Sequence, residues 1–149
     1  MELKSKNDLV IELVTKLFVY TDQREWQKLV GEVFMDDVVF DMSSLGGGPA
    51  KKVRSVEICD MWSKGFEGID HVHHHAGNYI VKFNSETESV AADVFCYATA
   101  THFKASAKNG NTRDFIGDYA IHVSLTDLGW RVDKFRYNVK FVLGNKELL

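Results

Sequence analysis

The sequence predicts an α+β fold, in which three N-terminal helices pack against one face of a strongly curved, mainly antiparallel sheet. Up to about residue 66, apolar residues mostly recur at spacings of three and four, as on one side of an α-helix. From residue 71 onwards strand-like segments dominate, separated by the turn sequences NSETE, KNGN and TDLG. Helices followed by strands are typical of the α+β class, and 149 residues suit a single domain, residues 1–149.

The first helix is expected to begin after Ser5, because Ser5 and Asp8 resemble a capping box. It should end around residues 20–23, and a second, short helix should follow with Trp26 on its apolar side. The chain then enters a β-rich segment, DDVVFDM. The other apolar positions of the two helices are Leu9, Val10, Leu13, Val14, Leu17, Leu29, Val30 and Val33.

The segment SSLGGGPAKK holds three glycines and Pro49, the only proline, and is therefore expected to be a loop. A third helix is predicted over residues 53–66, with Gly65 and Gly68 near its end. Four long strands, joined as an antiparallel meander, complete the chain. They are predicted over residues 71–83, 90–105, 115–126 and 130–142.

Composition excludes several classes of partner. Lys and Arg number 18 against 21 Asp and Glu, for a net charge of −3, and the charges are spread along the chain, so neither nucleic acid nor a membrane surface is an expected partner. No run of about 20 apolar residues occurs. Cys59 and Cys96 form no CxxC pair, which argues against a zinc ribbon and suits a reducing compartment. A cytoplasmic protein is expected.

The most unusual stretch is HVHHHAGNYIV, with four histidines in five residues. On a strand, His71, His73 and His75 share one face, whereas His74 falls on the other face with Val72, Ala76 and Ile80. Three imidazoles along one face could in principle bind a metal. Their Cβ atoms would be about 7 Å apart, however, and no acidic or thiol ligand is evident to complete a site. We therefore predict no metal and an exposed His71–His73–His75 face.

His74 is different, because an inward-facing imidazole needs a partner for its ring nitrogens. Asp22, at the junction of the first two helices, is the candidate. An alternative is that Asp22 caps the second helix, since Glu25 three residues later would complete a capping box. Both roles are compatible only if one carboxylate oxygen caps the helix while the other faces inward.

A further histidine lies on the strand around residues 117–125. Its odd positions are apolar or aromatic, including Tyr119, and are expected to face the helices. His122 lies on the opposite face among small and polar residues, so a surface or interface role is predicted for it.

Three segments together resemble a known family: YTDQREWQKLVGEVFMDDVVFDM, His74 followed by Asn78, and GDYAIHVSLTDLGWRVDKF. They resemble the SnoaL-like branch of the nuclear transport factor 2-like superfamily, and are most similar to scytalone dehydratase-like and bile-acid dehydratase-like proteins. The superfamily also includes limonene epoxide hydrolase and the ketosteroid isomerases. The resemblance covers roughly residues 8–142. It implies a cone-shaped, cystatin-like fold with a deep apolar pocket, and a homodimer formed through the sheet.

In dehydratases of this family, an aspartate four residues before a tryptophan pairs with a histidine of the sheet. Asp22 and Trp26 match that spacing, His74 matches the histidine, and His102 is similar to a second catalytic histidine. The sequence departs from the family at its two tyrosines, whose positions are held here by Thr21 and Asp41. Tyr20 and Tyr119 are candidates for the missing substrate-binding hydroxyls, and Asp41 is a further candidate substrate-binding residue.

The resemblance therefore implies a small lyase of the dehydratase type, or an isomerase or cyclase, that uses no cofactor. Its substrate would be a cyclic, apolar carbonyl compound, and Asp22, His74 and His102 would carry acid–base catalysis. One alternative is a ketosteroid-isomerase-like enzyme with Asp41 as the base. The other is a non-catalytic ligand-binding or assembly module; an assembly module would have its cone plugged by the third helix, through Met61 and Trp62.

Overall fold

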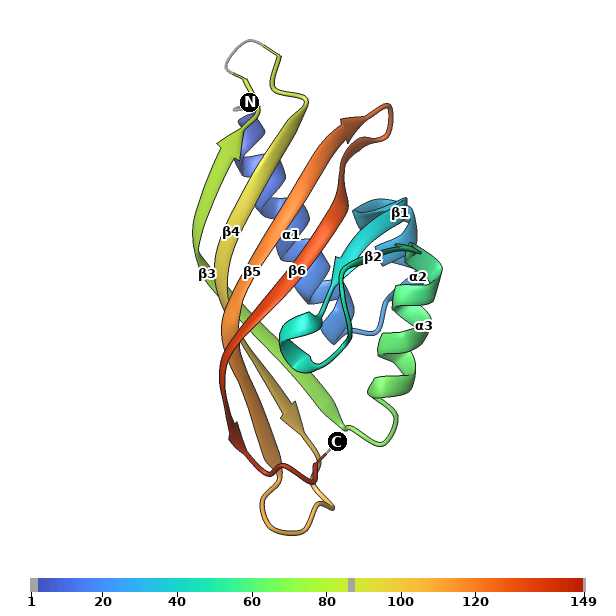
Figure 1. Ribbon diagram of the computed structural model, residues 1–149, viewed down its shortest axis with the longest axis vertical. Helices are drawn as coiled ribbons and strands as arrows, with labels where there is room; N and C mark the ends of the chain where they lie inside the picture. The colour runs from blue at the N-terminus through green and yellow to red at the C-terminus, as the bar shows by residue number, and fades with distance from the viewer. Residues whose placement is uncertain (1–2, 86–87, 149) are drawn as a thin grey trace.

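The computed structural model describes residues 3–85 and 88–148 and confirms the α+β class (Figure 1). Helix α1 lies across one face of a curved six-stranded sheet, and α2 and α3 lie beside β1 and β2. The helices are α1 (Lys6–Asp22), α2 (Trp26–Lys28) and α3 (Ser55–Gly65), with a π-helical turn η1 (Leu29–Val33) and a 3₁₀ turn η2 (Ser43–Leu45). No helix in the described part of the chain is long and apolar enough to span a membrane.

The sheet has the strand order β2-β1-β6-β5-β4-β3. Neighbouring strands run antiparallel, except for β1 and β6, which run parallel to each other. The strands are β1 (Phe34–Asp41), β2 (Lys51–Arg54), β3 (His71–Phe83), β4 (Ala91–Phe103), β5 (Thr112–Thr126) and β6 (Gly129–Gly144). The four predicted long strands are confirmed.

Strand β2 is the element that the sequence did not predict. It takes up the end of the expected loop and the start of the expected third helix, so placing Val53 in that helix was wrong. Four residues are too few to show a period-two pattern, and their pairing with β1 at the sheet edge is a tertiary contact.

Helix α1 is fixed at both ends. At its start, Ser5 and Asp8 form the predicted capping box. At its end, Arg24 adopts a positive φ of 56°, which turns the chain sharply. The guanidinium of Arg24 then donates to the carbonyl of Ile69 at 2.5 Å. Because Ile69 shortly precedes β3, this bond holds the end of α1 against the beginning of that strand.

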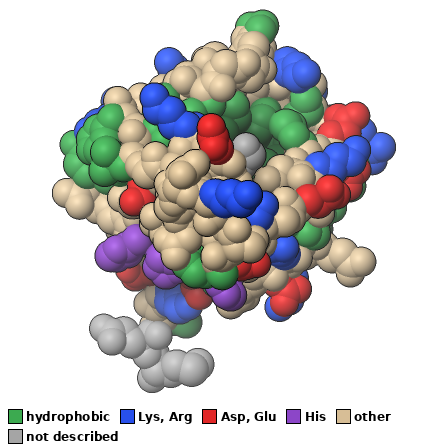
Figure 2. Space-filling view, turned by 90° about the horizontal axis from the view of Figure 1, so that it is seen from below, with side chains coloured by type: hydrophobic (Ala, Val, Ile, Leu, Met, Phe, Trp, Pro, Cys, Tyr) green, Lys and Arg blue, Asp and Glu red, His purple; other side chains and the backbone are tan. Residues whose placement is uncertain are grey.

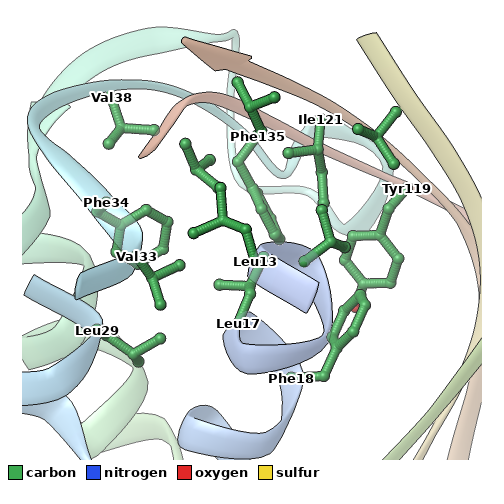
Figure 3. Close-up of a cluster of buried hydrophobic side chains, with 14 of the residues drawn as sticks. Leu13, Leu17, Phe18, Leu29, Val33, Phe34, Val38, Tyr119, Ile121 and Phe135 are labelled. Atoms are coloured by element: carbon green, nitrogen blue, oxygen red, sulfur yellow. The ribbon is translucent and has the colours of Figure 1, made fainter. Parts of the chain in front are cut away.

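The hydrophobic core lies between the helices and the concave side of the sheet (Figure 3). Leu13 and Leu17 of α1 are almost fully buried and point toward Ile121 and Phe135. Phe18 meets the edge of the Tyr119 ring, with centroids 5.0 Å apart. This packing positions the last turn of α1 over the sheet.

Strand β3 changes its inward face partway along. Its register with β4 shifts between Gly77 and Ile80, and Asn78 there has a positive φ of 56°. Such an extra residue is a β-bulge, which reverses the alternation of side chains beyond it. His74 therefore faces inward, whereas Ile80 is 65 % exposed. Placing Ile80 on the same face as His74 was wrong for this reason.

Small residues form the inner surface of the sheet beside His74. Ala76, Ala98 and Gly117 occupy one row across β3, β4 and β5. A Cβ at Gly117 would collide with the carbonyl oxygen of Asn138 and would lie 2.9 Å from the Tyr137 hydroxyl. Glycine at this position lets β6 and the Tyr137 ring approach closely.

We expect Gly117→Ala to lower the free energy of unfolding by about 1–3 kcal/mol, because the added methyl group forces the β5–β6 pair apart. Gly77→Ala is the matched control, since a Cβ at Gly77 meets nothing within 4 Å. Urea denaturation of both variants checks this. Equal stability of the two variants would contradict the close approach.

Candidate active site

Asp22 and His74 form a bonded pair at the corner between α1 and β3. The ring Nδ1 of His74 lies 2.6 Å from one carboxylate oxygen of Asp22. The backbone N–H of His74 donates to the other oxygen at 2.7 Å. Both side chains are largely buried, with 10 % of His74 and 16 % of Asp22 exposed. One carboxylate thus holds both the strand backbone and the imidazole of the same residue.

This geometry decides between the two roles considered for Asp22. Glu25 is the N-cap residue of α2, and no side chain caps that helix. Both oxygens of Asp22 contact His74, so the expectation that Asp22 caps the second helix was wrong. An ionised carboxylate only accepts hydrogen bonds, so Nδ1 carries the ring proton and Nε2 is left as a basic nitrogen.

His74 lines a partly open cavity of about 240 Å³, which is bounded by α1, η2, α3 and the sheet. Its polar lining residues are Thr21, His74, His102, Tyr119 and Tyr137. The remaining lining residues are Leu17, Phe18, Met42, Leu45, Trp62, Gly65, Phe66, Ala100, Phe115 and Phe135. The cavity is therefore an apolar space with a few polar groups on its wall, as in sites for small organic ligands.

His102 lies on β4 in the same cavity, in apolar surroundings. It is 8 % exposed, and the edges of Phe66 and Phe115 meet its ring at centroid distances of 5.8 and 5.2 Å. Burial, and secondly the nearby His74, lower the pKa of His102 to about 4. Its Nδ1 is buried without a partner among the described residues. His102 is therefore a neutral imidazole at neutral pH.

Two tyrosines, Tyr119 and Tyr137, also line the cavity. Tyr119 was expected from the sequence, and burial raises its pKa well above the ordinary value. Tyr137 of β6 was not expected, and its ring centroid lies 4.7 Å from that of Tyr119. The inward alternation of Phe135 and Tyr137 on the last strand could have indicated it.

Tyr20 and Asp41 lie outside the cavity lining, although the sequence suggested both as substrate-binding residues. The Tyr20 hydroxyl donates to Glu32 at 3.1 Å near the surface. The Asp41 carboxylate accepts from the backbone of Ser43 and lies 3.6 Å from Arg136. Thr21 does line the cavity, but its hydroxyl donates to the carbonyl of Leu17.

The remaining histidines face outward. His71, His73 and His75 are exposed, and Figure 2 shows histidine side chains gathered at one edge of that view. Within residues 3–85 and 88–148, no group of three or more potential ligands could hold a metal ion. His122 lies on the outer face, where Asp133 accepts from its Nδ1 and from Ser124.

A larger hollow, of about 1010 Å³, lies outside the sheet and includes His122 and Asp133. Four acidic and three basic residues line it: Asp36, Asp37, Asp127, Asp133, Lys52, Arg131 and Lys134. Many of these charged groups are exposed to solvent, and they carry both signs, so they do not indicate one particular type of ligand or reaction. The smaller inner cavity is the better candidate, because it encloses a buried base with a fixed tautomer.

The buried neutral His102 makes stability depend on pH. Its pKa is about 4 in the folded chain against an ordinary 6.5. Between these values the unfolded chain binds a proton that the folded chain excludes, so stability falls as the pH drops from 6.5 to 4. We expect a loss of about 3 kcal/mol from this group. Urea unfolding at pH 7 and pH 4 should show this loss in the wild type and not in His102→Gln; equal losses would contradict the assignment.

The chain matches the family model of the SnoaL-like domain over residues 5–136. Among curated protein sequences, none matches it. Solved structures with the same fold include the Kfla4162 protein from Kribbella flavida, with 19% identity, 92% of each chain covered and a TM-score of 0.82. A candidate scytalone dehydratase from Novosphingobium aromaticivorans has 16% identity over 92% of this chain and 85% of its own, with a TM-score of 0.71.

A third similar structure is a hexachlorocyclohexane dehydrochlorinase, LinA-type3, from Novosphingobium barchaimii. It has 11% identity over 95% of this chain and 90% of its own, with a TM-score of 0.74. At such identities the likeness concerns the fold, which agrees with the cone of helices over a curled sheet. With residues 5–136 matched, the chain belongs to the family of SnoaL-like domains.

Proposed function

We propose that the protein is a small lyase of the dehydratase type, or an isomerase or cyclase, which acts on a cyclic, apolar carbonyl compound without a cofactor. The observation that carries the proposal is the buried Asp22–His74 pair at the wall of an apolar cavity. The names of two similar structures, a candidate dehydratase and a dehydrochlorinase, are those of lyases, which supports the same class.

In the proposed reaction, Nε2 of His74 removes a proton from the carbon beside the carbonyl group. Asp22 stabilises the imidazolium that forms, since its carboxylate bonds the opposite ring nitrogen. The C–H electrons form the new double bond, and in a dehydratase the bond to the hydroxyl on the next carbon breaks. The departing hydroxide takes the proton back from His74. Water and an unsaturated carbonyl compound are the products, and the enzyme is unchanged.

His102 would contact the departing oxygen in this scheme. Its pKa of about 4 makes it a neutral hydrogen-bonding group at neutral pH rather than a charged acid. Tyr119, which stays protonated because burial raises its pKa, would donate to an oxygen that gains charge in the transition state. The two groups would thus stabilise charge without carrying any themselves.

The cavity volume narrows the substrate class. About 240 Å³ lies below the range of roughly 300–1,000 Å³ that is common for drug-sized ligands. A compound of one or two rings, of aromatic or polyketide type, therefore fits this space better than a steroid with four fused rings.

The alternatives receive less support. Asp41 is bonded to Ser43 outside the cavity lining, so a base at this position has no evident access to a ligand there. Trp62 packs among Phe34, Phe40 and Phe135 in the wall and leaves the cavity open, unlike the plug of an assembly module. A binding module with the same cavity is the alternative that an experiment must separate.

Proton exchange at the carbon beside a ketone tests the proposal without knowledge of the natural substrate. With 1-indanone in deuterated buffer, the wild-type protein should catalyse deuterium incorporation, which proton NMR follows. His74→Ala should lower the exchange rate by about 10²–10⁴, because it removes the base. Asp22→Asn should also lower it, since the amide cannot stabilise the imidazolium.

His73→Ala is the matched control, because the neighbouring imidazole is exposed on the other face of β3. It should leave the exchange rate unchanged. Affinity for 1-indanone should stay within about tenfold in His74→Ala, since the ring lost is one wall group among many. A wild-type protein that binds the ketone but catalyses no exchange would instead be a binding module.

We also propose a homodimer formed through the outer face of the sheet. Apolar side chains are exposed there: Ile80 by 65 %, Tyr97 by 44 %, Phe141 by 52 % and Leu143 by 54 %. Large apolar side chains that are exposed on one face are a feature of interaction sites. Phe141→Glu should weaken self-association at least about tenfold, since a charge would be buried in the interface. Light scattering after size-exclusion chromatography measures this; a monomeric wild type would exclude the dimer.

A cytoplasmic location is part of the proposal. It is supported by the two cysteines, Cys59 and Cys96, which are both buried free thiols. Thiols persist in reducing compartments, where disulfides are rare.

A further inference from the structure

Tyr137 places a buried hydroxyl without a partner beside the cavity. The residue is 3 % exposed, and its hydroxyl oxygen bonds to no group in the described residues. A buried polar atom that lacks a hydrogen bond destabilises the folded state, and few such atoms occur in folded proteins. Phenylalanine, which Phe135 shows is compatible with this strand and face, would pack without that penalty. The hydroxyl therefore calls for a partner that the described residues do not provide.

The position of the hydroxyl is set by the sheet. The Tyr137 ring lies over Gly117, where a Cβ would come within 3.0 Å of a ring carbon and 2.9 Å of the hydroxyl oxygen. On its other side the Tyr119 ring packs at 4.7 Å. From the neighbouring turn η2, the Ser44 hydroxyl donates to the Tyr137 carbonyl at 2.7 Å, which fixes the backbone. The phenol ring is therefore held in place, while its oxygen makes no hydrogen bond to any of the described residues.

Tyr137 and His74 belong to different sides of the cavity. Gly117 lies on β5 and His74 on β3, with β4 between them, so the two positions are two strand spacings apart, each roughly 4.8 Å. Both residues line the same cavity. A ligand of one or two rings between them could meet the imidazole at one edge and the phenol at another.

The phenol is a hydrogen-bond donor at all ordinary pH values. Burial, with a further effect from Asp118, raises its pKa to about 12. A protonated phenol has one O–H to donate, and a ligand oxygen is the simplest acceptor in an otherwise apolar space.

We propose that the Tyr137 hydroxyl donates a hydrogen bond to a carbonyl or hydroxyl oxygen of the ligand, and so selects oxygenated rings over hydrocarbons of the same shape. The inference rests on the proposed function only in taking the inner cavity as the ligand site, and it requires no catalysis by His74. Tyr137 is thus a specificity residue, and it supplies the hydroxyl that Thr21 and Asp41 do not.

The test compares 1-indanone with indane, which has the same rings without the oxygen. Tyr137→Phe should weaken binding of 1-indanone about three- to tenfold and leave indane unchanged, as calorimetric titration measures. The infrared carbonyl band of bound 1-indanone should move to higher wavenumber in the variant, because the donor is lost. Tyr97→Phe is the matched control, since Tyr97 is 44 % exposed on the outer face.

Stability gives an independent readout. Tyr137→Phe should keep or raise the melting temperature of the ligand-free protein, because it removes an unpaired buried oxygen. A lower melting temperature would reveal a structural partner for the hydroxyl and overturn the inference. Equal affinity of wild type and variant for 1-indanone would also overturn it, as would a wild type that does not bind the ketone. Loss of proton exchange in His74→Ala is a separate result, so failure of this inference leaves the proposed reaction standing.

Discussion

The double contact between Asp22 and His74 is the constraint on which the site depends. Asp22 is the last residue of α1, where the helix dipole disfavours a negative charge. Two donors from a single strand residue compensate for this, and the bond from Arg24 to Ile69 holds the same corner closed. The contact that orients the base therefore also joins the helix layer to the sheet. Positioning of the imidazole and cohesion of this corner cannot be separated.

The cavity follows from where the chain places small residues. Along the same concave face, Leu13 and Leu17 fill the space against Ile121 and Phe135 (Figure 3). Beside His74, the small side chain of Ala100 belongs to the cavity lining and leaves space free there. One sheet thus supports a close-packed core at one end and an open cavity at the other. The change in side-chain volume, rather than a change of fold, creates the site.

Sequence periodicity predicted α1, the long strands and the inward turn of His74, because these depend on patterns that extend over many residues. It could not predict β2, which is short, or the outward turn of Ile80, which follows from the bulge at Asn78. Asp22 shows a different limit. A carboxylate at the end of a helix can cap the next helix or bond a buried partner. The spacing alone favoured the cap, and only the family resemblance favoured His74. Tyr137 could not be predicted as a site residue, because what distinguishes it is a buried hydroxyl without a partner among the described residues. Only the packing of the folded chain shows this.

The unpaired atoms suggest why the cavity combines neutral groups with a single hydrogen-bonded Asp–His pair. His102 buries a nitrogen and Tyr137 an oxygen that have no hydrogen-bond partner within residues 3–85 and 88–148. Both side chains stay uncharged at neutral pH, because burial disfavours their ionised forms. In an apolar space, a neutral donor loses little by desolvation yet interacts strongly with charge that develops on a ligand. The carboxylate bonded to the inward imidazole is that of Asp22, which does not itself line the cavity. A carboxylate there would strengthen the base without repelling an enolate-like ligand, whereas the same charge inside the cavity would oppose it.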